Sequence, residues 1–221
     1  MTMPYFDEVT CPLCQRKTTI CGLASTNTFF EMVSLELRSD SYPIEFMIQS
    51  CDHCGYSADD LEEPVPEGIT LEWVKNVVYP DNMPDLAKNY YMAYAIQRHI
   101  KELIAAHYYI LGAAWACDDE KSTSCAKQCR DLAIELATEI LDDAAFQETE
   151  DGLTLILQTC DSIRRNGYFE RVPAWLDKYH FFDRDLPDYL ETVAKREISL
   201  AKEKNDSIQY TRGESDFDME E

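Results

Sequence analysis

Two short segments of this sequence carry the same pattern, Cys11-Pro12-Leu13-Cys14 and Cys51-Asp52-His53-Cys54. Two residues between cysteines allow a tight turn to point both sulfurs at one ion, and four thiolates complete the tetrahedral shell of Zn²⁺. Gly55 follows the second pair and suits such a turn, in which the backbone must curl its amides toward the sulfurs. The sequence therefore predicts one structural zinc site with Cys11, Cys14, Cys51 and Cys54 as its ligands.

Other uses of the four cysteines stay open at this point. Iron in a rubredoxin-like site has the identical ligand set, so the sequence hardly separates the two metals. A redox dithiol would require the strand–motif–helix setting of a thioredoxin-like pair, which this sequence does not resemble. Cys21 and His53 could replace a ligand, but the paired spacing favours the four cysteines. Four cysteines leave no coordination position for water, so a structural rather than a catalytic metal is expected.

Each cysteine pair follows a stretch with strand character, as in a zinc ribbon. Phe6–Val9 leads into the first pair, and Ile44–Ser50 alternates apolar and polar residues up to the second. Phe29–Leu37 also alternates in part and predicts a further strand. The two pairs are 36 residues apart, whereas a compact site has about 15–20. We therefore expect an insertion, placed at 25–42, that protrudes from the ribbon or wraps around it.

The charge of the chain is strongly one-sided. It has 42 Asp and Glu against 20 Lys and Arg, a formal net charge of -22, and residues 1–64 alone carry 11 acidic and 3 basic side chains. Affinity for nucleic acids comes from clustered Lys and Arg that neutralise phosphates. An acidic body argues against nucleic acids and anionic membranes as partners and favours basic proteins or metal ions. Solubility alone also explains such a surplus.

The cellular setting follows from what the chain lacks. No apolar run approaches the roughly 18 residues of a membrane-spanning helix, and Met1–Glu8 has no basic region followed by an apolar one, as a secretory signal would. We expect a cytoplasmic protein whose nine cysteines are reduced thiols. Cys125, Cys129 and Cys160 fall on apolar helical faces, where free cysteine behaves as a small buried hydrophobe.

From Asp85 to about Asn205, apolar residues recur at the three-to-four spacing of helices. Gly167 is well placed to end one of these helices because glycine tolerates the left-handed conformation. Short connections between them imply antiparallel neighbours. The expected helices are a short one capped by Thr70 and running to Tyr79, two over 85–115 with a break near His99, and others beginning after Ser122, over 151–166, over 168–179 and from Pro187 to about Lys204.

Four motifs together resemble one family. They are Cys11-Pro12-Leu13-Cys14, Cys51-Asp52-His53-Cys54-Gly55-Tyr56, Ala113-Ala114-Trp115 and Ile163-Arg164-Arg165-Asn166-Gly167-Tyr168-Phe169. They look like an uncharacterised bacterial family that joins an N-terminal zinc ribbon to helices similar to tetratricopeptide repeats. The resemblance covers roughly residues 5–205 and implies zinc, a cytosolic setting and no established activity. The chain departs from a true repeat array, because it has no clean 34-residue self-similarity and no full Trp-Leu-Gly-Tyr pattern.

The expected fold class is α+β, a small N-terminal zinc-ribbon-like β lobe followed by an all-α bundle similar to tetratricopeptide repeats. Proline and glycine at 62–68, with Pro80 and Pro84, break regular structure and mark a connector. The predicted ranges are a zinc-ribbon-like domain at 1–64, a connector with a short helix at 65–84, a helical domain at 85–205 and a disordered acidic tail at 206–221.

Patterns that would indicate catalysis are weak. The chain has no Gly-rich phosphate loop and no Gly-x-Ser-x-Gly. His99, Glu102 and His107 lie close on one helical stretch, but a metal bundle would need a second helix with Glu-x-x-His. Among 42 acids, neighbouring carboxylates carry little information. The doublets Arg164-Arg165 and Lys195-Arg196 are interpreted as helix-end and solvated-face charges, with a contact to a small anion or acidic peptide as the alternative.

The predicted function is therefore that of a zinc-binding, non-enzymatic interaction or scaffold protein, whose stacked helices present a groove to a protein or peptide partner. The acidic surplus favours a basic partner. The alternative is nucleic-acid binding or regulation through the zinc ribbon. Local charge disfavours it, since residues 1–64 sum to -8 and four thiolates around Zn²⁺ add about -2. A metal-dependent hydrolase in the helical domain is a third class.

Overall fold

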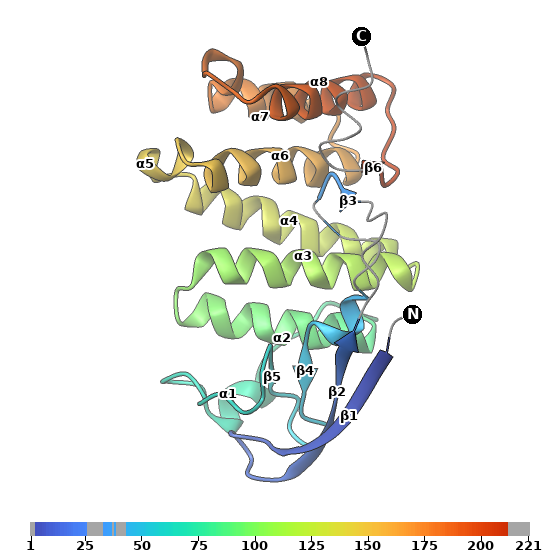
Figure 1. The fold of residues 1–221 in the computed structure, drawn as a ribbon, viewed down its shortest axis with the longest axis vertical. Helices are drawn as coiled ribbons and strands as arrows, with labels where there is room; N and C mark the ends of the chain where they lie inside the picture. Colours follow the sequence, from blue (N-terminus) through green and yellow to red (C-terminus); the bar gives the residue numbers. More distant parts are fainter. Residues whose placement is uncertain (1–2, 26–32, 37, 39–42, 212–221) are drawn as a thin grey trace. The chain divides into compact units, whose positions relative to one another are not determined.

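The protein has an α+β fold, seen here in a computed structural model that describes residues 3–25, 33–36, 38 and 43–211. An antiparallel β region near the N-terminus precedes eight α-helices within these residues (Figure 1), as predicted. The chain divides into two compact units, Met1–Asn27 with Tyr42–Cys129, and Thr28–Ser41 with Arg130–Glu221. Both units are therefore discontinuous in sequence, and their boundaries differ from those expected from composition.

Two antiparallel hairpins form the β region of the first unit. β1 (Met3–Thr10) pairs with β2 (Lys17–Ser25), and β4 (Gln49–Ser50) pairs with β5 (Ser57–Ala58). Each cysteine pair lies in the turn that joins the two strands of one hairpin. The sequence indicated a strand before each pair, and β2 and β5 are the strands that follow them.

The strand predicted at Ile44–Ser50 is wrong over most of its length. Ile44–Phe46 forms a 3₁₀ turn, and only Gln49–Ser50 is a strand. Ile44 and Ile48 are both buried, at 2% and 4% exposure. A spacing of four residues fits a helical turn, which the apparent alternation concealed.

Much of the strand predicted at Phe29–Leu37 lies outside the described residues. Within it, β3 covers only Val33–Ser34 and pairs antiparallel with β6 (Tyr210–Thr211). This pair belongs to the second unit. The strand β3, which lies in the predicted insertion at 25–42, therefore belongs to the second unit and not to the unit that holds the cysteine pairs.

The helices of the first unit begin and end near the predicted positions. α1 (Leu71–Lys75) is shorter than expected, but Thr70 caps it as predicted, since its Oγ1 accepts the Trp73 N–H at 3.1 Å. α2 (Asp85–His99) and α3 (Leu103–Asp119) confirm the break near His99. Lys101 lies in this break with a φ of 67°. Its left-handed conformation turns the chain back between the two helices.

α2 and α3 pack closely where Gly112 faces Tyr90. A Cβ at position 112 would lie 2.4 Å from the Tyr90 ring. Tyr90 is 1% exposed and donates its hydroxyl to the carbonyl of Ile44 at 2.7 Å. A glycine within a helix lowers helical propensity, and here its missing side chain makes room for a buried aromatic ring.

We predict that Gly112→Ala lowers the free energy of unfolding by about 1–3 kcal/mol, because the added methyl overpacks the contact with Tyr90. Urea unfolding measures this loss. In a Tyr90→Leu background the same substitution should cost less, since the facing ring is gone. An equal cost in both backgrounds would show that Tyr90 does not require the glycine.

The second unit contains most of the remaining helices. α6 ends as predicted at Gly167, whose φ is 81°. The N–H of Tyr168 donates to the carbonyl of Ile163 at 3.1 Å, which satisfies a free helix-end carbonyl. α5 was not predicted. The helices are α4 (Thr123–Ile140), which crosses the boundary between the units, α5 (Ala144–Gln147), α6 (Glu150–Arg165), α7 (Arg171–Lys178) and α8 (Asp188–Lys202).

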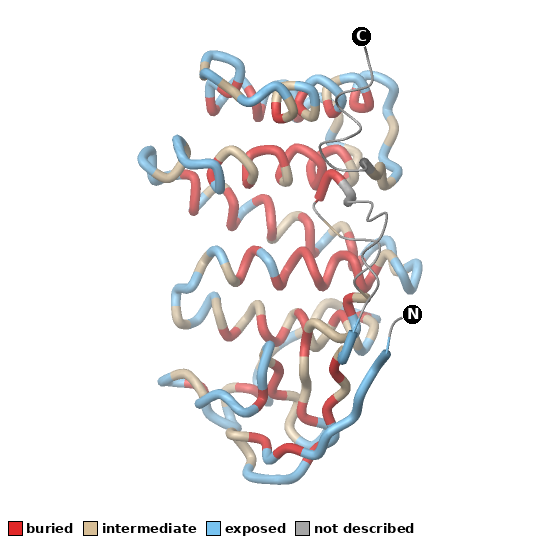
Figure 2. Tube along the Cα trace, in the orientation of Figure 1, coloured by how far each residue is buried: buried red, intermediate tan, exposed pale blue. Residues whose placement is uncertain are grey.

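Burial is concentrated along α3 in the first unit and α6 in the second (Figure 2). Along the described part of the chain, no helix combines the length and the apolar character needed to cross a bilayer. α6 differs from α3 because its buried face includes charged side chains, among them Asp161 and Arg164.

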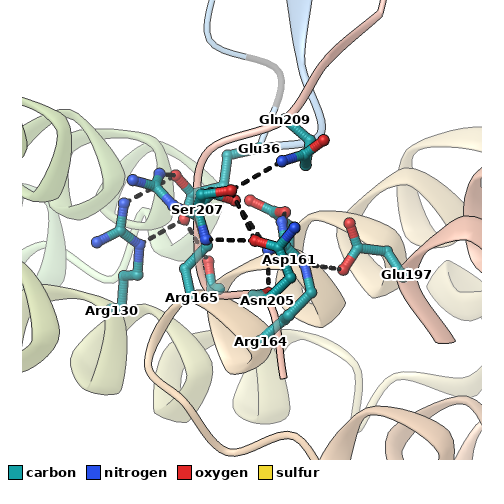
Figure 3. Close-up of polar contacts among 10 residues, drawn as sticks. Glu36, Arg130, Asp161, Arg164, Arg165, Glu197, Asn205, Ser207 and Gln209 are labelled. Atoms are coloured by element: carbon teal, nitrogen blue, oxygen red, sulfur yellow. Dashed lines mark hydrogen bonds and ion pairs between the residues drawn. The ribbon is translucent and has the colours of Figure 1, made fainter. Parts of the chain in front are cut away.

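The prediction that Arg164 and Arg165 lie on a solvated face is wrong. The Arg164 side chain is 0% exposed and that of Arg165 8%. Arg164 forms ion pairs with Asp161 and Glu197, and Arg165 with Glu36 (Figure 3). Apolar periodicity does not reveal the burial of these arginines, because the same helical face also carries the apolar residues of the core.

Glu36 is the centre of one part of this network. Its carboxylate accepts two hydrogen bonds from Arg130, Nε to Oε1 at 2.6 Å and Nη2 to Oε2 at 3.0 Å, and it also contacts Arg165. The Ser162 hydroxyl donates to Oε1 at 3.1 Å, and Gln158 donates to the backbone carbonyl of Glu36 at 3.3 Å. A buried carboxylate is thus matched by two guanidinium groups, which offsets much of its desolvation cost.

We predict that Glu36→Gln destabilises the second unit by about 3–5 kcal/mol, because it leaves two buried guanidinium groups without their carboxylate. Hydrogen exchange of the amides of α6 measures the change. Glu45→Gln, at an exposed position, is the control and should change stability by less than about 0.5 kcal/mol. Equal protection in the two variants would contradict a stabilising role for Glu36.

Candidate metal centre

The first cysteine pair is held by the turn between β1 and β2. The carbonyl of Cys11 accepts the N–H of Gln15 at 2.9 Å, and the N–H of Cys11 donates to the carbonyl of Arg16 at 2.9 Å. Gln15 has a φ of 59°. A non-glycine residue in this left-handed region is strained by about 1–2 kcal/mol, so the turn is maintained by the contacts around it.

The second pair repeats this geometry between β4 and β5. The carbonyl of Cys51 accepts the N–H of Gly55 at 2.8 Å, and the N–H of Cys51 donates to the carbonyl of Tyr56 at 2.9 Å. Gly55 has a φ of 76°, and an added Cβ would meet no atom within 4 Å. Backbone conformation, rather than space, is therefore what favours glycine after the second pair.

The two turns bring all four predicted cysteines together. Their sulfur atoms lie within 4.8 Å of one another, with Cys11 Sγ 3.7 Å from Cys54 Sγ and Cys14 Sγ 3.6 Å from Cys51 Sγ. A tetrahedral ion with sulfur bonds of about 2.3 Å requires sulfur separations of about 3.8 Å. The cluster therefore fits a single tetrahedral metal ion.

Neither alternative ligand joins this cluster. The Nε2 atom of His53 is 2.8 Å from the carbonyl oxygen of Lys17, within hydrogen-bond distance. Cys21 lies on β2 and is not part of the group of close sulfur atoms. The N–H of Asp52 donates to Thr18 Oγ1 at 3.2 Å. The residues between Cys51 and Cys54 thus attach the second turn to the first hairpin.

The metal cluster is continuous with the core of the first unit. Cys11 and Cys51 are 0% and 1% exposed, and Cys14 and Cys54 are half-buried. The same core includes residues of the ribbon, of the predicted connector and of α2, which explains why the first unit extends beyond residue 64. These residues are Val9, Ile20, Tyr56, Leu61, Ile69, Val74, Met92 and Ile96.

The protonation of the thiols affects how the cluster binds a metal. Burial raises the pKa of the Cys11 thiol and raises that of the Cys54 thiol well above its ordinary value. For Cys14, burial also acts to raise the pKa, but hydrogen bonds from the Arg16 backbone and the neighbouring sulfurs outweigh it, and the pKa is lowered. Zinc binds thiolates, so binding releases protons, and the affinity falls as pH falls.

The other histidines and cysteines considered in the sequence form no second cluster of this kind within the described ranges. The His99 ring packs 5.1 Å from that of Trp73. Cys125, Cys129 and Cys160 are buried, at 1%, 0% and 0% exposure, as predicted. Burial also raises the pKa of Cys160 well above its ordinary value, which makes its thiol a poor nucleophile.

We predict that the isolated protein contains one tightly held metal ion, and that replacing Cys14 and Cys54 with Ser abolishes it. Cys21→Ser is the matched control and should retain the metal.

Chelation should expose the β region to proteolysis, because structural zinc supplies about 10–16 kcal/mol of apparent binding energy. Elemental analysis and limited proteolysis measure these effects. Release should become easier on acidification, and an unchanged proteolysis pattern after chelation would contradict the prediction.

Comparison with known proteins adds no relative. No family model, curated protein or solved structure matches this chain. The resemblance to a family with a zinc ribbon and repeat-like helices therefore stays a prediction.

Proposed function

We propose that the protein is a zinc-binding, non-enzymatic interaction module, in which a structural zinc ion organises the first unit. The observation that carries this proposal is the group of four cysteine sulfurs with tetrahedral spacing. Four thiolates close the coordination shell of zinc and leave no position for water or substrate. The strands β4 and β5 have only two residues each, and an isolated two-stranded hairpin is at best marginally stable in water, so the stability of the β region depends on the metal.

The choice of zinc over iron rests on chemistry. Both ions accept four thiolates. Zinc is not redox-active, and it therefore suits a cluster whose proposed role is to hold two hairpins together. Half of the cluster is buried in the core of the unit. Elemental analysis of protein isolated from its host distinguishes the two metals directly.

The proposed partner is a basic protein or peptide. A hollow of about 560 Å³ in the first unit supports this, since both acidic and apolar side chains line it. Its acidic residues are Glu45, Asp85, Asp119 and Glu120, and its apolar ones are Pro84, Leu86 and Ala116. Such a site suits the aliphatic stem and charged end of Lys or Arg. The net charge of -22 attracts the same class of partner.

The helical architecture is compatible with a scaffold role. α2 and α3 are joined by a short turn, as are α6 and α7, and proteins built from such helix pairs use them to bind peptides. The resemblance to tetratricopeptide-like helices noted in the sequence supports the same proposal. We propose that the protein acts in the cytoplasm, in keeping with its free cysteines.

We predict that a Lys/Arg-rich amphipathic peptide binds the intact zinc-loaded protein, and that its Glu-substituted counterpart and duplex DNA do not. Fluorescence anisotropy at low and moderate salt measures binding, which should weaken with salt. Replacing Glu45 and Glu120 with Lys should weaken the affinity by about tenfold, the equivalent of about 1.4 kcal/mol.

The matched control reverses the same number of charges at Glu62 and Glu63, which are exposed and lie outside the hollow. It should retain most of the affinity. If both double variants lose affinity equally, net charge and not the hollow attracts the peptide. Binding of DNA in preference to the basic peptide would replace this proposal with nucleic-acid recognition.

A further inference from the structure

Two buried carboxyl groups share one arginine inside the second unit. Asp161 on α6 and Glu197 on α8 are 1% and 0% exposed. The guanidinium of Arg164 forms an ion pair with Asp161 and donates from Nε to Glu197 Oε2 at 2.8 Å (Figure 3). With both carboxyls ionised, this group of three would carry a net charge of −1. Burying such a charge is costly unless it is neutralised.

Each carboxyl also has one oxygen that Arg164 does not satisfy. Asp161 Oδ2 and Glu197 Oε1 are fully buried and lack a hydrogen-bond partner. Burial raises the pKa of both groups; the charge of Glu36 adds to the rise for Asp161, and the charge of Asp161 adds to the rise for Glu197. A single proton held between the two acids would satisfy both oxygens and make the group of three neutral.

A second group, Glu36 with Arg130 and Arg165, carries a net charge of +1, but its ion pairs are made within that group and leave Asp161 Oδ2 and Glu197 Oε1 without a hydrogen bond. Glu36 takes the bidentate contact of Arg130 and the contact of Arg165. At longer range their effects on Asp161 oppose one another, since Glu36 raises its pKa and Arg165 lowers it.

The Cys160 thiol is buried beside the pair, and its raised pKa keeps it neutral. On α7, which packs against both helices, the charged side chains of Arg171, Asp177 and Lys178 are exposed, as is Glu170 just before it. On α8, Lys195 pairs with Glu191 near the surface, and Arg196 is exposed.

The same arginine holds the segment after α8. Arg164 Nη1 donates to the backbone carbonyls of Asn205 at 2.7 Å and Ser207 at 2.9 Å. One guanidinium therefore connects α6 with α8 through Glu197 and with residues 205–207 through their backbone. Any change in the charge of the carboxyl pair acts on all of these contacts.

We propose that Asp161 and Glu197 share one proton in the folded protein, and that this proton is a latch that keeps α8 and residues 205–207 on α6. When the proton leaves, both buried carboxylates, Asp161 on α6 and Glu197 on α8, are charged and repel each other. Arg164 cannot neutralise both. The latch therefore opens as pH rises.

The direction of the pH dependence follows from linkage. A carboxyl whose pKa is raised on folding stabilises the folded state at low pH, and this stability is lost as pH rises through the folded pKa. Opening of α8 releases one proton, so between the ordinary carboxyl pKa, about 4, and the raised value the opening constant increases about tenfold per pH unit.

Hydrogen exchange of the full-length protein tests the proposal. Opening constants for amides of α8 and residues 205–211, corrected for the pH dependence of chemical exchange, should rise about tenfold per pH unit in the wild type. Glu197→Gln should abolish this slope, because the amide donates permanently to Asp161. Glu203→Gln, an exposed acid after α8, is the matched control and should keep it.

Infrared spectroscopy of the wild type reads the proton directly and does not depend on any variant folding. A protonated carboxyl band at neutral pH is expected and should disappear as α8 becomes less protected. The proposal is overturned by the absence of that band, by opening constants that do not change with pH, or by a slope that persists in Glu197→Gln.

Discussion

The meeting of four sulfur atoms within 4.8 Å is the constraint on which the first unit depends. The two cysteine pairs are 36 residues apart in sequence, and each sits in a two-stranded hairpin, which by itself is at best marginally stable in water. A metal ion bound by the four sulfurs would convert the two turns into one cross-link. The core beneath it, from Val9 and Ile20 to Met92 and Ile96, could then form on a fixed framework, with the ion replacing area that a small lobe cannot bury.

In the second unit, buried ion pairs connect elements that are distant in sequence. Glu36 reaches Arg130 and Arg165, and Arg164 reaches Asp161 and Glu197, so buried ions join elements distant in sequence. Such ion pairs add little net stability compared with apolar packing, but removing one partner is expensive. The network therefore penalises alternative arrangements of these elements more than it stabilises the native one.

The features visible in sequence are those set by local rules. Cysteine spacing located the metal cluster, and apolar periodicity located the helices and the turn at Gly167. The strand prediction at Ile44–Ser50 was wrong because the buried Ile44 and Ile48 are four residues apart, a spacing that fits both strand alternation and a helical turn. The prediction that Arg164 is solvated was wrong because its burial depends on Glu197 and on the backbone carbonyls of Asn205 and Ser207. Local sequence does not reveal these partners. Among 42 acids, nothing distinguished the buried ones.

The stretch between the cysteine pairs is restrained twice, by the metal cluster at its ends and by Glu36 near its middle. The magnitudes decide how far these restraints influence one another. Halving a closed loop changes its closure entropy by only about 0.6 kcal/mol, whereas a structural zinc ion would contribute about 10–16 kcal/mol and breaking a buried ion pair costs about 3–5 kcal/mol. The covalent link is therefore a weak coupling. Loss of a bound metal would act chiefly on the first unit, and breaking the buried ion pairs of Glu36 or Arg164 chiefly on the second, because each of these energies is several times larger than the term they share.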